Sequence, residues 1–292
     1  MEILILLALA CAPGAFIIGY VYLRDRFEPE PVGLLAKSFV YGILSVLVTV
    51  LVSLPIMAVL PIDEKSLSQQ AFHAFILVAF IEEGSKFLFV RGILYRNKNF
   101  NEPYDGIIYA IMVGMGFATL ENILYSFQHG VGVALFRMFT AVPAHASFAV
   151  LMGYFLGKEK FEKRSNLYGA WALGSATLLH GAYDYCLFVD FVPGIWIGAG
   201  VSLLIGVRLS LAAIRSHQAA SPFRPEAVSR PHSPGPEIRD QNIAEGDARL
   251  SVGLIKVVCP ACGFSRESEP VHVGHILTCP ACTEEFTVAN TV

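Results

Sequence analysis

Two adjacent glutamates and a lysine interrupt an otherwise apolar stretch of the chain. In the segment FIEEGSKF, Glu82, Glu83 and Lys86 have hydrophobic residues on both sides for at least a helical turn. A charge at the centre of a membrane helix costs about 2.5 to 3.5 kcal/mol on insertion scales, so such residues indicate a functional site. A structural ion pair that locks two helices together is the alternative explanation.

The spacing of these three residues suits acid and base chemistry. Glu82 and Lys86 are four residues apart, so they share a helix face and the ammonium can neutralise one carboxylate, while Glu83 points about 100° away. Two nearby carboxylates in a low dielectric resist joint ionisation, and a lysine beside one of them keeps that one charged. One carboxylate can then act as an acid and the other as a base.

Further acids and imidazoles follow in three later apolar stretches. Glu121 lies in GFATLENILY and His145 in TAVPAHASF. His180 and Asp184, in LLHGAYDYC, are four residues apart and therefore share a helix face, where the carboxylate can fix the imidazole tautomer. Taken one stretch at a time, each has a structural explanation. Glu121 could be a carboxylate at the membrane rim, His145 could form an interhelical hydrogen bond, and His180 with Asp184 could be a packed pair. Four stretches with such groups favour one shared site.

Carboxylates and imidazoles together activate water, either directly or through a bound metal, so the chemistry that these residues predict is hydrolysis. The sequence has no serine in a nucleophile-elbow context and lacks the Gly-x-Gly-Asp pattern of intramembrane aspartyl proteases. The alternative class is a transporter, proton relay or receptor that uses the same buried groups. An inert scaffold is a third possibility.

The elements that must position these groups are membrane helices. Hydrophobic residues make up 54% of the chain and charged residues 15%, which excludes an ordinary soluble fold. Strand-like alternation is absent, so the sequence predicts an all-α polytopic membrane bundle of about seven transmembrane helices. The apolar stretches lie near residues 3–23, 34–60, 70–95, 105–127, 133–157, 167–189 and 193–214.

Basic residues predict the orientation of these helices, because Lys and Arg in short loops stay on the cytoplasmic side. The odd-numbered loops and the end of the last stretch are basic: Arg24, Arg26, Lys37, Arg91, Arg96, Lys98, Lys158, Lys160, Lys163, Arg164, Arg208 and Arg215. The even-numbered loops hold only Lys65 and Arg137. The first stretch lacks a basic n-region and is expected to remain as an uncleaved anchor. We therefore expect a multi-pass cell-membrane protein with its N-terminus outside and its C-terminus in the cytoplasm.

The C-terminal part has a different composition. The sequence predicts a membrane domain at 1–215, a disordered linker rich in Pro, Ser and charge at 216–250, and a small β-rich zinc-ribbon domain at 251–292. Two Cys-x-x-Cys pairs 16 residues apart supply the four ligands of a structural zinc ion: Cys259, Cys262, Cys279 and Cys282. Iron or a redox dithiol is the alternative. A cytosolic protein partner is the simplest role for this domain, and nucleic acid is not indicated.

At these residues the chain resembles the PrsW family of intramembrane proteases, which is related to the CAAX prenyl protease group. YLRDRFEPEP at 22–31, FIEEGSKF, GFATLEN, the His145 segment and HGAYD at 180–184 resemble the family's motifs in order. The resemblance implies cleavage of a membrane-anchored protein substrate in the lipid bilayer, such as an anti-sigma factor or another regulatory protein.

The resemblance also implies roles for individual residues. Glu82 or Glu83 would be the general base, helped by His145, and Lys86 would tune the ionisation of the glutamates. His180 with Asp184 would orient the water or stabilise the oxyanion. If the reaction uses a catalytic zinc ion, the candidate ligands are Glu121, His145 and His180. The absence of a His-Glu-x-x-His helix leaves zinc catalysis open.

Overall fold

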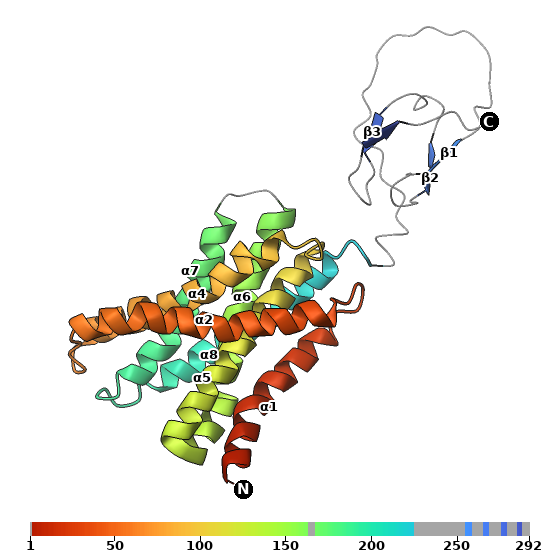
Figure 1. Cartoon of the computed structure of the whole chain (residues 1–292). Coiled ribbons are helices and arrows are strands. Elements are labelled where there is room, and N and C mark those ends of the chain that lie inside the picture. The colour runs from red at the N-terminus through yellow and green to blue at the C-terminus, as the bar shows by residue number, and fades with distance from the viewer. Residues whose placement is uncertain are drawn as a thin grey trace. The chain divides into compact units, whose positions relative to one another are not determined.

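The computed structural model describes residues 2–162 and 167–224 and the backbone of four short strands between residues 255 and 287. The chain divides into two units, Met1–His232 and Ser233–Val292. Helices build the described part of the first unit (Figure 1): α1 (Glu2–Tyr22), α2 (Val32–Val59), α3 (Leu67–Phe72), η1 (His73–Phe80), α4 (Ile81–Gly92), η2 (Leu94–Arg96), α5 (Pro103–Phe139), α6 (Ala141–Phe161), α7 (Tyr168–Phe188) and α8 (Ile197–Ala219).

The helices have the character of a membrane protein. Among the described residues, four helices are long and apolar enough to cross a membrane: Ile3–Tyr22, Val32–Val59, Pro103–Phe139 and Ile197–Ala219. α1 and α2 carry many exposed Leu, Ile and Val side chains, which water would disfavour and lipid accommodates. The helical fold and the membrane location agree with the sequence, whereas the number of seven spans stays a prediction.

α5 is the central helix of the bundle and packs against α1, α2 and α6. Residues 104–118 are all buried, as expected for a helix that is apolar on every side. Gly106 and Gly153 let α5 and α6 approach closely, since a Cβ at Gly153 would lie 2.6 Å from the carbonyl carbon of Gly106. Small residues at helix contacts are typical of membrane bundles.

The chain reverses direction within the element named α5. Gly130 has φ 80° and ψ −172°, a conformation that L side chains rarely adopt. The sequence predicted a span that begins near residue 133, but residues 131–139 form a separate short helical segment and α6 begins only at Ala141. The predicted boundary was wrong because periodicity cannot show that a glycine turns the backbone.

Two further features concern the helix that carries the glutamates and the C-terminal unit. α3, η1 and α4 follow one another without a break, and η1 is a π-helix that ends two residues before Glu82. In the second unit β1 (Ile255–Val258) pairs with β2 (Ser265–Ser268), and β3 (Ile276–Thr278) pairs with β4 (Glu285–Thr287), both antiparallel. The four predicted zinc ligands and most of the predicted linker lie outside the described residues.

Candidate active site

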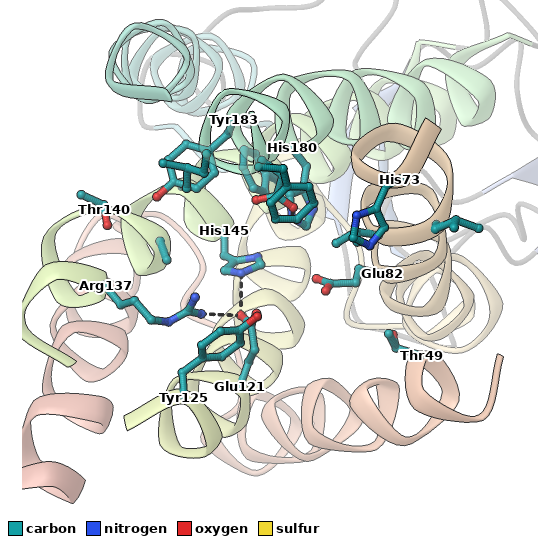
Figure 2. A pocket seen from close by; sticks show the side chains of 18 of the residues that line it. Thr49, His73, Glu82, Glu121, Tyr125, Arg137, Thr140, His145, His180 and Tyr183 are labelled. Atoms are coloured by element: carbon teal, nitrogen blue, oxygen red, sulfur yellow. Dashed lines mark hydrogen bonds and ion pairs between the residues drawn. The ribbon is translucent and has the colours of Figure 1, made fainter. Parts of the chain in front are cut away.

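A cavity of about 650 Å³ brings together the polar residues that the sequence placed on separate helices. Glu82 of α4, Glu121 of α5, His145 of α6, and His180 and Asp184 of α7 all line it. Figure 2 shows Glu82 and His145 directed into the same space, with Glu121 directed toward His145. Carboxylates and imidazoles from four helices therefore share one pocket.

Lys86 lies between the two glutamates of its own helix. Its Nζ is 2.7 Å from Glu83 Oε1 and 3.5 Å from Glu82 Oε2. The expectation that Glu83 points away from Lys86 was wrong, because residues three apart on a helix are also neighbours. Glu83 is fully buried and does not line the cavity, whereas Glu82 does and is 13% exposed. The two adjacent carboxylates thus have different surroundings.

His180 is held between two carboxylates. Its Nδ1 is 2.9 Å from Glu83 Oε1, and its Nε2 is 3.1 Å from Asp184 Oδ2. An ionised carboxylate only accepts hydrogen bonds, so both ring nitrogens donate in this arrangement. The ring also stacks on Phe148 with centroids 4.6 Å apart. The orientation of the imidazole is therefore fixed by two hydrogen bonds and one aromatic contact.

His145 faces Glu121 on one side and Lys86 on the other. Its Nε2 is 2.9 Å from Glu121 Oε2, and its Nδ1 is 3.4 Å from Lys86 Nζ. The carboxylate accepts and the ammonium donates, so this geometry assigns the proton to Nε2 and makes the Nδ1 lone pair the acceptor of a long contact from Lys86. The His145 and His180 rings lie 5.2 Å apart between centroids.

Arg137 is the residue that the sequence reasoning missed. Its Nη2 is 2.8 Å from the same Glu121 oxygen that accepts from His145, and its Nε is 3.0 Å from Asn122 Oδ1 (Figure 2 shows the contact with Glu121). The sequence counted Arg137 as a loop residue. In a straight helix it would lie about 22 Å beyond Asn122, and the turn at Gly130 brings it back. An arginine in the apolar run GVGVALFRMF was the available signal.

A second layer of contacts supports the glutamate helix. Thr49 Oγ1 of α2 and Ser85 Oγ are 2.6 Å apart, and Ser85 also donates to the carbonyl of Glu82 at 2.9 Å. Lys86 Nζ lies 3.9 Å from the centroid of the Phe117 ring, a distance that suits a cation–π contact. α2 and α5 thereby fix the helix turn that presents Glu82 to the cavity.

The part of the chain that contains this cavity matches a known protein family. Residues 30–213 match the model of a family described as PrsW family intramembrane metalloprotease. The chain belongs to this family. The matched range contains every residue of the cavity described above, so the PrsW assignment covers the whole candidate site.

Individual PrsW proteins are similar to the chain over most of its membrane part. A protein named Protease PrsW from Geobacillus kaustophilus is 36% identical over 225 residues, which cover 76% of this chain and 96% of that protein. Protease PrsW from Bacillus subtilis is 38% identical over 180 residues, 60% of this chain and 79% of that protein. No solved structure matches the chain. The predicted intramembrane protease activity is confirmed by this family membership, which sets the transporter and scaffold alternatives aside.

The PrsW family name implies a metal, and the donor set of the cavity fits one. One ligand atom each of Glu82, His145 and His180 lie within 4.8 Å of one another. Glu82 Oε2 is buried and accepts no hydrogen bond among the described residues, and the ammonium of Lys86 is 3.5 Å away. Two imidazoles and a carboxylate are a ligand set that zinc accepts. The structure therefore groups Glu82 with the two histidines, whereas Glu121, the carboxylate that the sequence suggested, contacts Arg137.

Proposed function

We propose that this intramembrane protease cleaves single-span membrane proteins with Glu82 as the general base. The observation that carries the proposal is the difference between the two glutamates. Glu82 lines the cavity and its side chain is 13% exposed, whereas Glu83 is fully buried, does not line the cavity and has Oε1 bound by both Lys86 and His180. A base must reach the water whose proton it accepts, and of these two glutamates only Glu82 meets that requirement.

The reaction needs one water and one peptide bond. Glu82 accepts a proton while the water oxygen attacks the carbonyl carbon, and that proton then passes to the amine nitrogen as the carbon–nitrogen bond breaks. One ring nitrogen of His145 lies within 4.8 Å of a Glu82 oxygen, so the imidazole borders the space in which the attacking water has to sit. Glu121 and Arg137 hold His145 in the tautomer with its proton on Nε2.

The remaining groups keep the site charged and rigid. Lys86 compensates both glutamates, and Glu83 with Asp184 fixes His180 at the wall of the cavity. Glu83, Asp184 and Lys86 are therefore positioning residues in this proposal, because they act through Glu82 and His180.

A catalytic zinc ion is part of the proposal. Glu82, His145 and His180 would hold it through one atom each, with the second carboxylate oxygen of Glu82 left to accept the proton, and the ion would supply polarisation of the substrate carbonyl and acidification of a water molecule. His180 donates from both ring nitrogens to carboxylates, so it has to give up one of these hydrogen bonds to become a ligand.

Replacing Glu82 by Gln tests the proposal, and replacing its neighbour Glu83 is the matched control. In proteoliposomes with a single-span substrate, Glu82→Gln should lower kcat by about 10²- to 10⁴-fold, the usual contribution of a general base, without lowering the thermal unfolding midpoint. Glu83→Gln should lower the midpoint as well, because it removes the partner of a buried ammonium. Wild-type kcat in a folded Glu82→Gln protein would overturn the assignment of the base.

We further propose seven membrane-crossing segments: α1, α2, the continuous α3, η1 and α4, then the first part of α5, α6, α7 and α8. Helix ends with basic residues support this arrangement because they contact one another. Lys160 Nζ donates to the carbonyl of Tyr95 at 2.7 Å, and Gln218 Nε2 donates to the carbonyl of Arg24 at 2.6 Å. These ends form one face, which the positive-inside rule assigns to the cytoplasm.

Two labelling experiments test the orientation. With an impermeant maleimide added to intact cells, a cysteine replacing Lys65 should react from outside. A cysteine replacing Lys98 should react only after lysis. The reverse pattern would contradict an outside N-terminus and a cytoplasmic C-terminus.

The C-terminal unit is proposed to be a zinc ribbon that binds a cytosolic partner. Each Cys-x-x-Cys pair falls in a segment, 259–264 or 279–284, that joins two antiparallel strands, as the knuckles of a ribbon do. Elemental analysis of the purified chain should show that Cys259→Ser loses one equivalent of zinc. Retention of all the zinc would reject the ribbon. The substrate class, an anti-sigma factor or another regulatory membrane protein, is supported by the family resemblance.

A further inference from the structure

A second group of carboxylates lies outside the active site, at the other end of α5. Glu28 and Glu30 come from the connection between α1 and α2, and Asp105 comes from the first turn of α5. One carboxylate oxygen of each residue lies within 4.8 Å of the others. Asp105 precedes Glu121 by 16 residues, about 24 Å along a helix. The cavity and this group are therefore separate sites.

The fold holds these carboxylates in place and leaves one oxygen of each without a donor. Backbone N–H groups of Asn101 and Glu102 donate to Asp105 Oδ2 at 2.7 Å each, and the Tyr109 hydroxyl donates to Glu30 Oε2. Asp105 is 0% exposed and Glu30 2%. Asp105 Oδ1, Glu30 Oε1 and Glu28 Oε2 are buried atoms with no hydrogen-bond partner among the described residues.

No basic side chain in the described part of the chain forms a direct ion pair with the group, and Lys160 is the one that interacts with Asp105 electrostatically from farther away. The ion pairs formed by the described residues do not include Glu28, Glu30 or Asp105. Two further buried carboxylates, Asp25 and Glu102, are close enough to interact with these residues electrostatically, and each also has an unpartnered oxygen. Buried anions without partners are costly, so such a group calls for a cation.

We propose that Glu28, Glu30 and Asp105 bind a hard divalent cation such as Mg²⁺ or Ca²⁺. All the donors are carboxylate oxygens, which these ions prefer over the nitrogen and sulfur ligands of zinc. Their mutual separations fit one coordination sphere, because oxygens on opposite sides of Ca²⁺ are about 4.6 to 5.2 Å apart. Glu28 is only half-buried and provides the side from which an ion can enter. The ion fastens the connection between α1 and α2 to the start of α5.

The test measures ion binding by stability and does not depend on proteolysis. The full-length protein in detergent is stripped with EDTA, and its thermal unfolding midpoint is followed while MgCl₂ or CaCl₂ is added to about 10 mM, above the Kd of weak oxygen-ligand sites. A hundredfold excess over Kd should raise the midpoint by about 5 to 10 °C. Glu28→Gln, at the half-buried position, and Asp105→Asn should weaken the apparent affinity at least tenfold.

Glu64→Gln is the matched control, because Glu64 is an exposed acid in another loop and should respond as the wild type does. An equal response in Glu28→Gln and Glu64→Gln would show general ionic stabilisation and overturn the site. A wild-type midpoint that ignores both ions but rises on acidification would mean that protons, and not a metal ion, neutralise the group, and would also overturn it. Loss of proteolysis in Glu82→Gln has no bearing on either result, so the two proposals fail separately.

Discussion

Arg137 offers the sharpest test of how the active site is held together. Its guanidinium lies 2.8 Å from Glu121 Oε2 and 3.0 Å from Asn122 Oδ1, and the Arg137 and Glu121 side chains are 14% and 18% exposed. A hydrogen bond to a charged group contributes about 1.5 to 3 kcal/mol. If Arg137→Gln removes that amount from the transition state, kcat should fall by about 10- to 150-fold.

The assay must separate positioning from binding. In proteoliposomes with a single-span substrate, Arg137→Gln should lower kcat and leave KM nearly unchanged, since Arg137 acts on His145 through Glu121. Arg137→Lys keeps the charge but loses the planar fork, so it should restore only part of the rate.

Arg91 provides the matched control. It forms an ion pair of the same length, 2.8 Å, with Glu159, and neither residue lines the cavity, so Arg91→Gln should change kcat less than twofold because partly exposed pairs contribute little. The reasoning is refuted if Arg137→Gln keeps the wild-type kcat or if Arg91→Gln loses as much.

Three other predictions follow from the packing and the donor set. Gly153→Ala should lower the unfolding midpoint by several degrees, because its Cβ would lie 2.6 Å from facing α5 backbone and overpacking costs about 1 to 3 kcal/mol; Gly174→Ala, with no atom within 4 Å, should not. Lys86→Met should unfold the protein or abolish proteolysis by removing the ammonium that neutralises the buried Glu82 and Glu83, and adding Glu83→Gln should restore stability but not the rate. His180→Ala should reduce bound zinc by one equivalent in elemental analysis, and an unchanged zinc content would exclude His180 as a ligand.

The sequence predicted the site to the level of helices but not of side-chain contacts. Each acid or histidine in an apolar run was costly enough to indicate function, so Glu121, His145 and His180 could be named before the structure. Helical spacing could not show which of Glu82 and Glu83 faces the cavity, because that choice depends on how α4 packs against α7. Arg137 escaped notice because its contact depends on the backbone conformation of a single glycine.

The π-helix η1 sets a constraint on chain length. A π-turn adds one residue to a helical turn, so it rotates everything after it by about 100° relative to an uninterrupted α-helix. Deleting one residue between His73 and Phe80 could restore regular α-helical hydrogen bonding, and yet it would turn Glu82 away from the histidines. The number of residues in this segment is therefore constrained more tightly than their identity. An insertion or deletion there would inactivate the enzyme and leave it folded.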